Sequence, residues 1–238
     1  MKLLRLRQLH RWVALVVGLQ VLVWTASGLM FAWLDQGSVA GEGLAEAPVP
    51  TALPATADLL EPARLPFAAA TPVVSALELR MVDGRWVYRV ETDAGVRLLR
   101  ASDGAPVAVD AAVARRLAAS HYRGQGRLRT VKLHATETLE TRELGPAWEA
   151  AFDDDSGTRL YFSDADGSLV AVRTDAWRLK DLFWMLHTMD YRGRDDFNNP
   201  LVMVAGTAAA WVGLTGLWLL ARVMRPRREG KDERLART

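Results

Sequence analysis

Two long apolar runs stand near the ends of the chain, and neither contains a charged side chain. They extend over residues 12–34 and 200–221. At about 1.5 Å of rise per residue, a helix of such length reaches about 33 Å, enough to cross a hydrocarbon core of about 30 Å. The pattern predicts two transmembrane helices, at 12–34 and 200–222.

The segment after the first run has a different character, because six of the ten prolines of the chain lie within residues 47–72. Proline at this density is incompatible with a helix or a central strand, and it favours extended chain. We therefore predict a Pro/Ala-rich spacer over residues 35–73. The prolines are Pro48, Pro50, Pro54, Pro62, Pro66 and Pro72.

Apolar positions then alternate with polar ones in two similar stretches within residues 74–199. This period of two predicts strands with one buried face, and the Asp/Gly pairs between them predict turns. Helical patterns follow at 109–120 and 175–189. Trp86, Val90, Asp93, Gly95, Arg97, Leu98, Asp103 and Gly104 recur 62 or 63 residues later as Trp148, Phe152, Asp155, Gly157, Arg159, Leu160, Asp166 and Gly167.

This recurrence predicts a duplicated unit, an antiparallel β-hairpin followed by a helix. The first copy covers about 76–121 and the second about 127–190. The expected fold class is α+β, with an antiparallel sheet and helices on one face. The second helical pattern is apolar around much of its circumference, so we expect it to lie against the bilayer or the first span, or within the core of the domain.

The distribution of charge predicts the topology of the chain. The net charge is +2 and the isoelectric point about 9.1. Residues 1–11 carry four basic side chains and no acid, and the tail from residue 222 carries seven basic side chains against three acids, so the middle is acidic. Basic flanks stay in the cytoplasm. We expect a bacterial inner-membrane protein with cytoplasmic ends at 1–11 and 223–238 and a periplasmic middle, with no nucleic-acid binding.

An alternative for the first run is a cleaved signal peptide, with small-residue sites at residues 38–40 and 45–47. The run is longer than the apolar core of a signal peptide, which favours an uncleaved anchor. In the second run Ala205, Ala209 and Gly213 are spaced by four. Such a face allows close helix contact, in a homodimer or with a membrane partner, although small residues are also common in membrane helices.

The sequence contains few candidates for catalytic or metal-binding residues. The chain has no cysteine, which excludes disulfides, thiolate metal sites and a thiol nucleophile. It has no metalloprotease, serine-hydrolase, phosphate-loop or dinucleotide motif, so an enzyme acting alone is not expected. The acids at 153–155, 164 and 166 are interpreted as solvated turns rather than a calcium loop.

The four histidines are the remaining candidates. His10 and His187 lie at opposite ends of the first span, and either could bind haem or be structural. Because about 30 Å separates them, they cannot share one iron within a monomer. His121 and His134 are expected at the surface.

Several motifs together resemble the PepSY-associated transmembrane proteins. They are His10-Arg11-Trp12 opening a span that ends Ser27-Gly28-Leu29, Phe183-Trp184-Met185-Leu186-His187, Met189-Asp190-Tyr191, Asp196-Phe197-Asn198-Asn199-Pro200 and Thr215-Gly216-Leu217-Trp218. The resemblance covers about 1–34 and 74–222. It implies that the duplicated unit, residues 74–199, is a PepSY-like domain on the outer face of the membrane.

The resemblance also implies three functions. The first is a non-enzymatic accessory or regulatory module that binds a periplasmic or membrane partner. The second is a haem b electron-transfer subunit of a ferric-siderophore reduction system in iron uptake, with His187 and His10 as ligands. The third is a module that restrains a peptidase. Larger members with four spans resemble haem-bearing reductases, and two spans here make an autonomous reductase doubtful.

Overall fold

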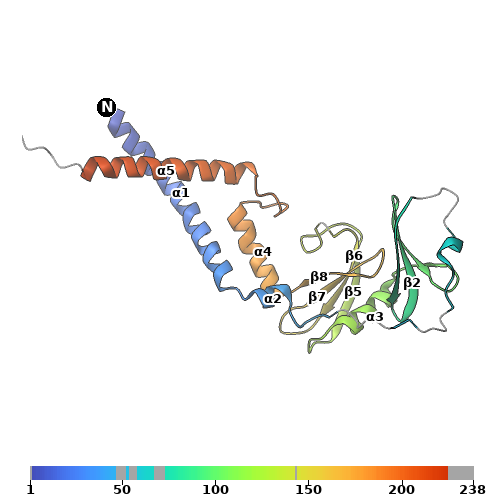
Figure 1. Cartoon of the computed structure of the whole chain (residues 1–238). Helices are drawn as coiled ribbons and strands as arrows, with labels where there is room; N and C mark the ends of the chain where they lie inside the picture. Colours follow the sequence, from blue (N-terminus) through green and yellow to red (C-terminus); the bar gives the residue numbers. More distant parts are fainter. Residues whose placement is uncertain (1, 47–51, 54–57, 67–72, 143, 225–238) are drawn as a thin grey trace, which may run out of the picture. The chain divides into compact units, whose positions relative to one another are not determined.

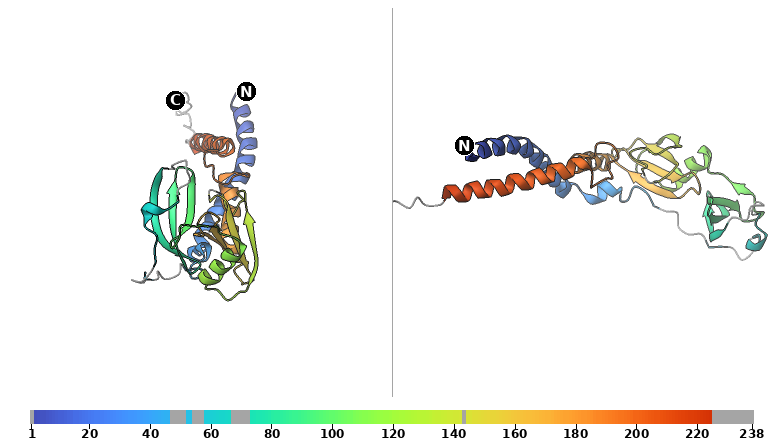
Figure 2. Two further views of the ribbon diagram at one scale, coloured as in Figure 1. Left: turned by 90° about the vertical axis from the view of Figure 1, so that its right-hand side faces the viewer. Right: turned by 90° about the horizontal axis from the view of Figure 1, so that it is seen from above.

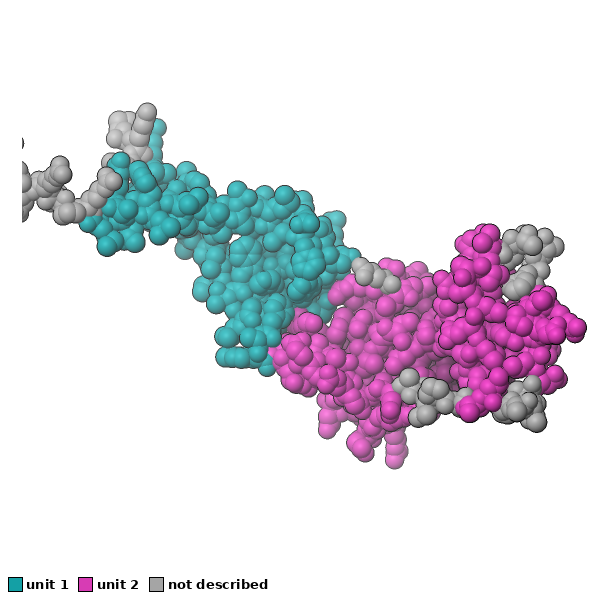
Figure 3. All heavy atoms as spheres, viewed as in Figure 1, with its two compact units in different colours: residues 1–33, 181–238 teal, residues 34–180 magenta. Residues whose placement is uncertain are grey.

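A computed structural model describes residues 2–46, 52–53, 58–66, 73–142 and 144–224. The chain divides into two compact units (Figure 3). Residues 1–33 and 181–238 form the first, here named the helical unit, and residues 34–180 form the second, the sheet unit. The boundary assigns 181–199 to the helical unit and 34–73 to the sheet unit, which differs from the division into spacer and domain expected from the sequence.

The helical unit contains α1 (Lys2–Trp33), the end of α4 (Asp175–Thr188) and α5 (Pro200–Met224). Its apolar stretches Arg5–Trp33 and Pro200–Met224 are both long and apolar enough to cross a membrane. The two predicted long helices are confirmed. The first begins earlier than the predicted span, because residues 2–11 contain no proline or glycine to interrupt the helix.

Helices α1 and α5 contact each other within this unit (Figure 1). The His10 ring of α1 lies 6.1 Å from the Trp211 ring, centroid to centroid. It also approaches Gly216 so closely that a Cβ there would lie 3.6 Å from its Cε1 atom. By contrast, no atom lies within 4 Å of a Cβ built at Gly213. Gly213, one of the predicted small residues, therefore does not contact α1. Contact of this small-residue face with a partner stays a prediction.

The connection from α4 to α5 is organised by two side chains. The Asp190 carboxylate accepts hydrogen bonds of 3.1–3.2 Å from four backbone N–H groups of the connection. These bonds lower the pKa of Asp190 to about 2. Asn199 accepts the N–H of Val202 at 3.1 Å and so caps α5, with Pro200 at the first helical position. The four N–H groups belong to Arg192, Gly193, Asp195 and Asp196.

The sheet unit contains two antiparallel four-stranded sheets, each with its strands in sequence order. Each sheet is followed by a helix, α3 (Ala111–His121) after the first and α4 after the second. The predicted α+β class with antiparallel pairing is confirmed. The strands are β1 (Val74–Val82), β2 (Arg85–Thr92), β3 (Gly95–Arg100), β4 (Pro106–Val107), β5 (Leu128–His134), β6 (Ala147–Phe152), β7 (Arg159–Ser163) and β8 (Leu169–Arg173).

One hydrophobic core joins the two sheets through α3. Figure 2 shows the ribbon of α3 beside the sheets. Asp110 caps this helix by accepting the N–H of Val113 at 2.8 Å. The apolar face of α3 packs against both sheets, so each sheet buries its inner face with the help of the helix. The buried residues are Val82, Val87, Leu98, Val109, Val113, Leu117, Ala118, Ala150, Phe152, Leu160 and Phe162.

The other face of the first sheet is covered by part of the expected spacer. Leu59, Leu60 and Leu65 pack against the cluster around Tyr88, and the Tyr88 hydroxyl donates to the Leu60 carbonyl at 2.7 Å. A short 3-10 turn, Pro62–Arg64, lies within this stretch. Residues 58–66 are otherwise irregular, as the prolines suggest, but they pack on the sheet because their leucines have an apolar surface to cover. At the start of the predicted spacer a short helix, α2 (Gln36–Ala40), forms, so the expectation of extended chain is wrong there.

The tryptophans of the recurring pattern both lie on strands. Trp86 and Trp148 are each the second residue of their strands, β2 and β6. Trp86 packs against the cluster on the outer face of the first sheet, whereas Trp148 packs against the core shared with α3. The two positions are alike in the strand but differ in what covers them, and common descent of the two halves remains a proposal.

Candidate functional site

His187 lies on α4 and contacts α1 at three places. Its Nδ1 atom lies 2.8 Å from the Ser27 hydroxyl, and its carbonyl accepts the indole N–H of Trp24 at 2.8 Å. Its ring meets the Phe31 ring edge-on at 5.6 Å. Of the alternatives expected for this helix, these contacts show packing of its end, residues 181–188, against the first span. The contact lies at Trp24–Phe31, and Trp33 stays exposed.

The Ser27 hydroxyl has two kinds of partner. It lies 2.8 Å from Nδ1 of His187 and also 2.8 Å from the Val23 carbonyl of its own helix. A hydroxyl that donates to Val23 accepts from Nδ1–H of the histidine. That arrangement leaves the lone pair on Nε2, the atom that can bind iron or accept a hydrogen bond.

His10 repeats this arrangement at the other end of α1. Its Nδ1 atom lies 2.8 Å from the Thr215 hydroxyl, which itself donates to the Trp211 carbonyl at 2.7 Å. A Thr215 hydroxyl that donates to Trp211 accepts from Nδ1–H of His10, the same arrangement as at His187. The sequence suggested both histidines, but it gave no sign of the hydroxyl partners, which lie far away in the chain.

The structure does not bring His10 and His187 together. His187 contacts Ser27, seventeen residues beyond His10 on the continuous helix α1. At about 1.5 Å per residue, the two rings are separated by about 26 Å along the axis. They form two separate positions, as the sequence suggested.

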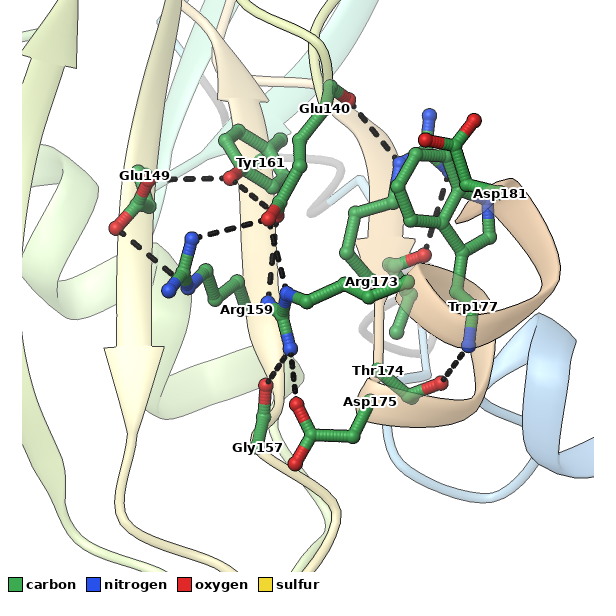
Figure 4. Close-up of polar contacts among 12 residues, drawn as sticks. Glu140, Glu149, Gly157, Arg159, Tyr161, Arg173, Thr174, Asp175, Trp177 and Asp181 are labelled. Carbon is green, nitrogen blue, oxygen red and sulfur yellow. Dashed lines mark hydrogen bonds and ion pairs between the residues drawn. The ribbon is translucent and has the colours of Figure 1, made fainter. Parts of the chain in front are cut away.

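A polar network that the sequence did not suggest lies on the second sheet (Figure 4). The Glu140 carboxylate accepts from Arg159 at 3.0 Å, from Arg178 at 2.9 Å and from the Tyr161 hydroxyl at 2.8 Å. Tyr161 also lies 3.0 Å from Glu149. Its members come from a loop, two strands and a helix, so no local motif could have revealed them.

Burial and charge act in opposite directions on this network. Burial alone would raise the pKa of Glu140, but the hydrogen bonds from Arg178 and Tyr161 outweigh it, so the pKa lies below its ordinary value. Burial and the neighbouring Glu140 raise the pKa of Tyr161. At neutral pH, Glu140 is a carboxylate and Tyr161 a neutral donor. The network is internally satisfied, and its role is to fix the sheet and the start of α4.

A cleft of about 1160 Å³ lies between β1, α3 and the turn that joins β7 to β8. Its lining is mainly apolar and includes consecutive residues of β1 from Glu78 to Val82. Near it, Asp166 accepts from Arg89 at 2.8 Å, with Arg80 at 3.7 Å. Burial would raise the pKa of Asp166, but hydrogen bonds from Ser168 and Arg89 lower it to about 2.

His121 lines the same cleft, and its expected surface position is wrong. The residue is only 6% exposed, because it ends α3 where the helix packs on Phe162. Burial lowers its pKa, so the ring is neutral at pH 7. Its Nδ1 atom donates to the Leu117 carbonyl at 2.8 Å, which leaves the lone pair on Nε2. His134 is also half-buried, since its Nε2 atom pairs with Glu149 at 2.9 Å.

The acidic turn residues have structural partners. Asp154 accepts from the N–H of Thr158 at 2.8 Å and from the Tyr122 hydroxyl at 2.7 Å. Asp166 is buried, so the solvated-turn interpretation is wrong for that residue. Within the described ranges, no group of three or more His, Asp or Glu side chains is placed to hold a metal ion.

Comparison with known proteins gives no further identification. No family model, curated protein or solved structure matches the chain. The resemblance to PepSY-associated proteins therefore rests on the motifs themselves. Several of their residues have structural roles here, notably Asp190 and Asn199 in the connection, and Trp184, which donates to the Arg194 carbonyl at 3.0 Å and stacks edge-on with Phe197.

Proposed function

We propose that the protein is a bacterial inner-membrane protein of the PepSY-associated type, with α1 and α5 as its spans. Both termini lie in the cytoplasm, and the sheet unit lies in the periplasm. Two features support this topology. The helices have the length and hydropathy of spans, and the basic side chains gather at the two ends of the chain while the middle is acidic.

The sheet unit acts as a non-enzymatic accessory or regulatory module that binds a polypeptide partner. The cleft between β1 and α3 carries this proposal. It is mainly apolar, and it is bordered by β1, whose outer edge carries no strand among the described residues. Of the charged groups around it, Arg116 is paired with Asp83, and Arg80 lies near Asp166. A surface of this kind favours binding through apolar contact and backbone hydrogen bonds over chemistry on a charged substrate.

Site-specific photo-cross-linking in living cells tests the function. Ser120 lines the cleft, and the neighbouring Ala119 is exposed outside it, so benzoylphenylalanine at these two positions makes a matched pair. We expect a discrete adduct, identified by mass spectrometry as one polypeptide, from the Ser120 position only. Equal adducts at both positions, or none at either, would contradict the proposal.

A second candidate function is haem b binding in electron transfer, and the histidine–hydroxyl pairs favour it. In each pair a hydroxyl lies 2.8 Å from Nδ1, and with the proton on Nδ1 the lone pair of Nε2 suits an axial ligand. His187 and His10 would each hold one haem from one side, which would supply one-electron redox chemistry. A second axial ligand would come from another copy or another protein.

An absorbance spectrum tests this second candidate. If haem is bound, the protein from haem-replete cells shows a Soret band, and His187→Ala abolishes or shifts part of it. The replacement His121→Ala, in the other unit, leaves the spectrum unchanged. Ser27→Ala removes the Nδ1 partner and shifts the reduction potential while the band remains. A colourless protein excludes the haem function.

A further inference from the structure

We propose that the cleft binds an extended segment of the partner polypeptide as an additional strand on the free edge of β1. This inference rests on the proposed function and specifies how the partner is bound. The occupant is a single strand of about seven residues, near neutral in charge, in which apolar and polar side chains alternate.

The register of the first sheet shows which backbone groups of β1 are available. A two-residue turn, Asp83-Gly84, joins β1 to β2, and Met81 lies opposite Trp86. The Trp86 carbonyl accepts the N–H of Ala101, so the backbone groups of Trp86 point away from β1. In an antiparallel pair the facing residue then points away as well. Met81, and by alternation Leu79 and Leu77, direct their N–H and C=O groups outwards.

These outward groups form a regular template. Three donor–acceptor pairs recur at every second residue, about 6.8 Å apart. Among the described residues, β1 pairs only with β2, so its outer edge carries no strand. Only another polypeptide in extended conformation offers donors and acceptors at this repeat, which identifies the chemical class of the occupant.

The cleft beside β1 has walls from other parts of the sheet unit. Ser120 and His121 of α3 and the turn at Gly167-Ser168 line it, and so does Leu53, from the segment that precedes the first sheet. The proposed occupant of this bounded space is a single extended chain, and pairing with β1 of a second copy is an outcome of the test.

His121 supplies an independent sign of a ligand. The residue is 6% exposed, yet it lines the cleft, and Nδ1 is already used in the bond to Leu117. The hydrogen bonds of the ring all involve Nδ1, and no described residue pairs with Nε2. A nearly buried imidazole that lines a cleft favours a ligand with a donor group at that position, such as a hydroxyl or amide side chain.

The two faces of β1 specify the side chains of the added strand. Leu79 packs on the face of Trp86, and this apolar stripe would continue onto apolar residues of the partner. The alternate face carries Glu78 and Arg80, next to Asp166. Arg116 is paired with Asp83 by two hydrogen bonds of 2.6 and 2.7 Å. Arg80 and Arg116 thus have acidic partners, whereas Glu78 has none among the described residues, so neutral polar residues with a donor group suit the alternate positions.

Peptide binding to the full chain in detergent tests the proposal. The probes are an array of fluorescent heptapeptides that alternate Val or Leu with Thr, Ser or Asn. The strongest binder is then N-methylated at its even or its odd residues. Both products keep every side chain, but only one keeps the N–H groups that face β1. We expect one pattern to lose binding at least tenfold and the other to retain it.

Protein variants locate the site. Leu79→Pro and Met81→Pro each remove an outward N–H that β2 does not use, so the sheet is retained and binding falls at least tenfold. Thermal unfolding checks that each variant is folded. Equal binding of the two methylated peptides, unchanged binding to folded variants, or no binder in the array overturns the inference. Dimerisation that Leu79→Pro abolishes would overturn it in favour of self-pairing.

These outcomes are separate from the test of the proposed function. An adduct at Ser120 without any dependence on the β1 edge leaves the accessory function standing and rejects strand addition. No adduct at Ser120 or at Ala119 rejects the accessory function itself.

Discussion

The carboxylate of Asp166 joins the two sheets of the sheet unit. It lies in the turn after β7, in the second sheet, and accepts from Arg89 of the first sheet at 2.8 Å. Its side chain is 7% exposed, so this ion pair is shielded from solvent more than a surface pair. Ser168 completes its hydrogen bonding. One buried carboxylate thus fixes how the sheets pack around α3.

Replacing Asp166 with asparagine should destabilise the protein in a pH-dependent way. The pKa of about 2 in the folded state lies below the unfolded value of about 3.9. The ionised group therefore contributes stability above about pH 4, about 2 kcal/mol, and this contribution is lost as pH falls from about 4 to about 2. Urea unfolding should show Asp166→Asn less stable at pH 7 and similar to the wild type near pH 2.

The exposed Asp93 provides the control for that comparison. Asp93→Asn should leave the unfolding midpoint at pH 7 unchanged. An Asp166→Asn protein as stable as the wild type at pH 7 would show that the carboxylate does not join the sheets as described.

Individual residues also mark the limit of the sequence analysis. His10 and His187 were identifiable because a histidine beside an apolar span is unusual. The role of Glu140 was not, because its partners Arg159 and Arg178 are brought to it by folding alone. His121 was misplaced because helical periodicity does not show that the end of α3 lies against Phe162.

At the scale of elements, the strands are held by apolar faces that the alternation pattern identified. Strands β2, β3, β6 and β7 lie where period-two alternation predicted them, and α3 and α4 lie within two residues of the predicted helices. The covering of the first sheet by residues 58–66 was not predicted. Proline content shows that a segment is irregular, but it does not show whether that segment packs.

Removing the side chain of Trp148 should test directly how β6 packs on α3. Its ring packs against the shared core, and its indole N–H donates to the Val109 carbonyl at 2.9 Å. Trp148→Ala should lower the free energy of unfolding by about 3 kcal/mol, the low end of the usual range for a large aromatic residue because the ring is only half-buried.

The milder variant Trp148→Phe separates packing from hydrogen bonding. It keeps an apolar ring but leaves the Val109 carbonyl without its donor, at a cost of about 1 kcal/mol. Denaturation of both variants should give this order of stability. If both were within 0.5 kcal/mol of the wild type, β6 would not pack on α3 through Trp148.

At the scale of the whole molecule, the distribution of charge and of apolar residues supports the proposed topology. The two basic ends flank helices that the described structure leaves almost unburied, which suits contact with lipid. The sheet unit has its own hydrophobic core and polar networks. The central claim is therefore a topology with both ends in the cytoplasm and the sheet unit outside.

Cysteine accessibility tests that claim directly, because the chain has no cysteine of its own. Single replacements are made at Ala135, exposed in the sheet unit, at Ala210, in α5, and at Lys231, in the C-terminal tail. A membrane-impermeant thiol reagent, applied to cells whose outer membrane has been permeabilised, should label Ala135→Cys, leave Ala210→Cys unlabelled, and label Lys231→Cys only after lysis. Labelling of Lys231→Cys before lysis with protection of Ala135→Cys would contradict the proposed topology and the periplasmic location of the cleft.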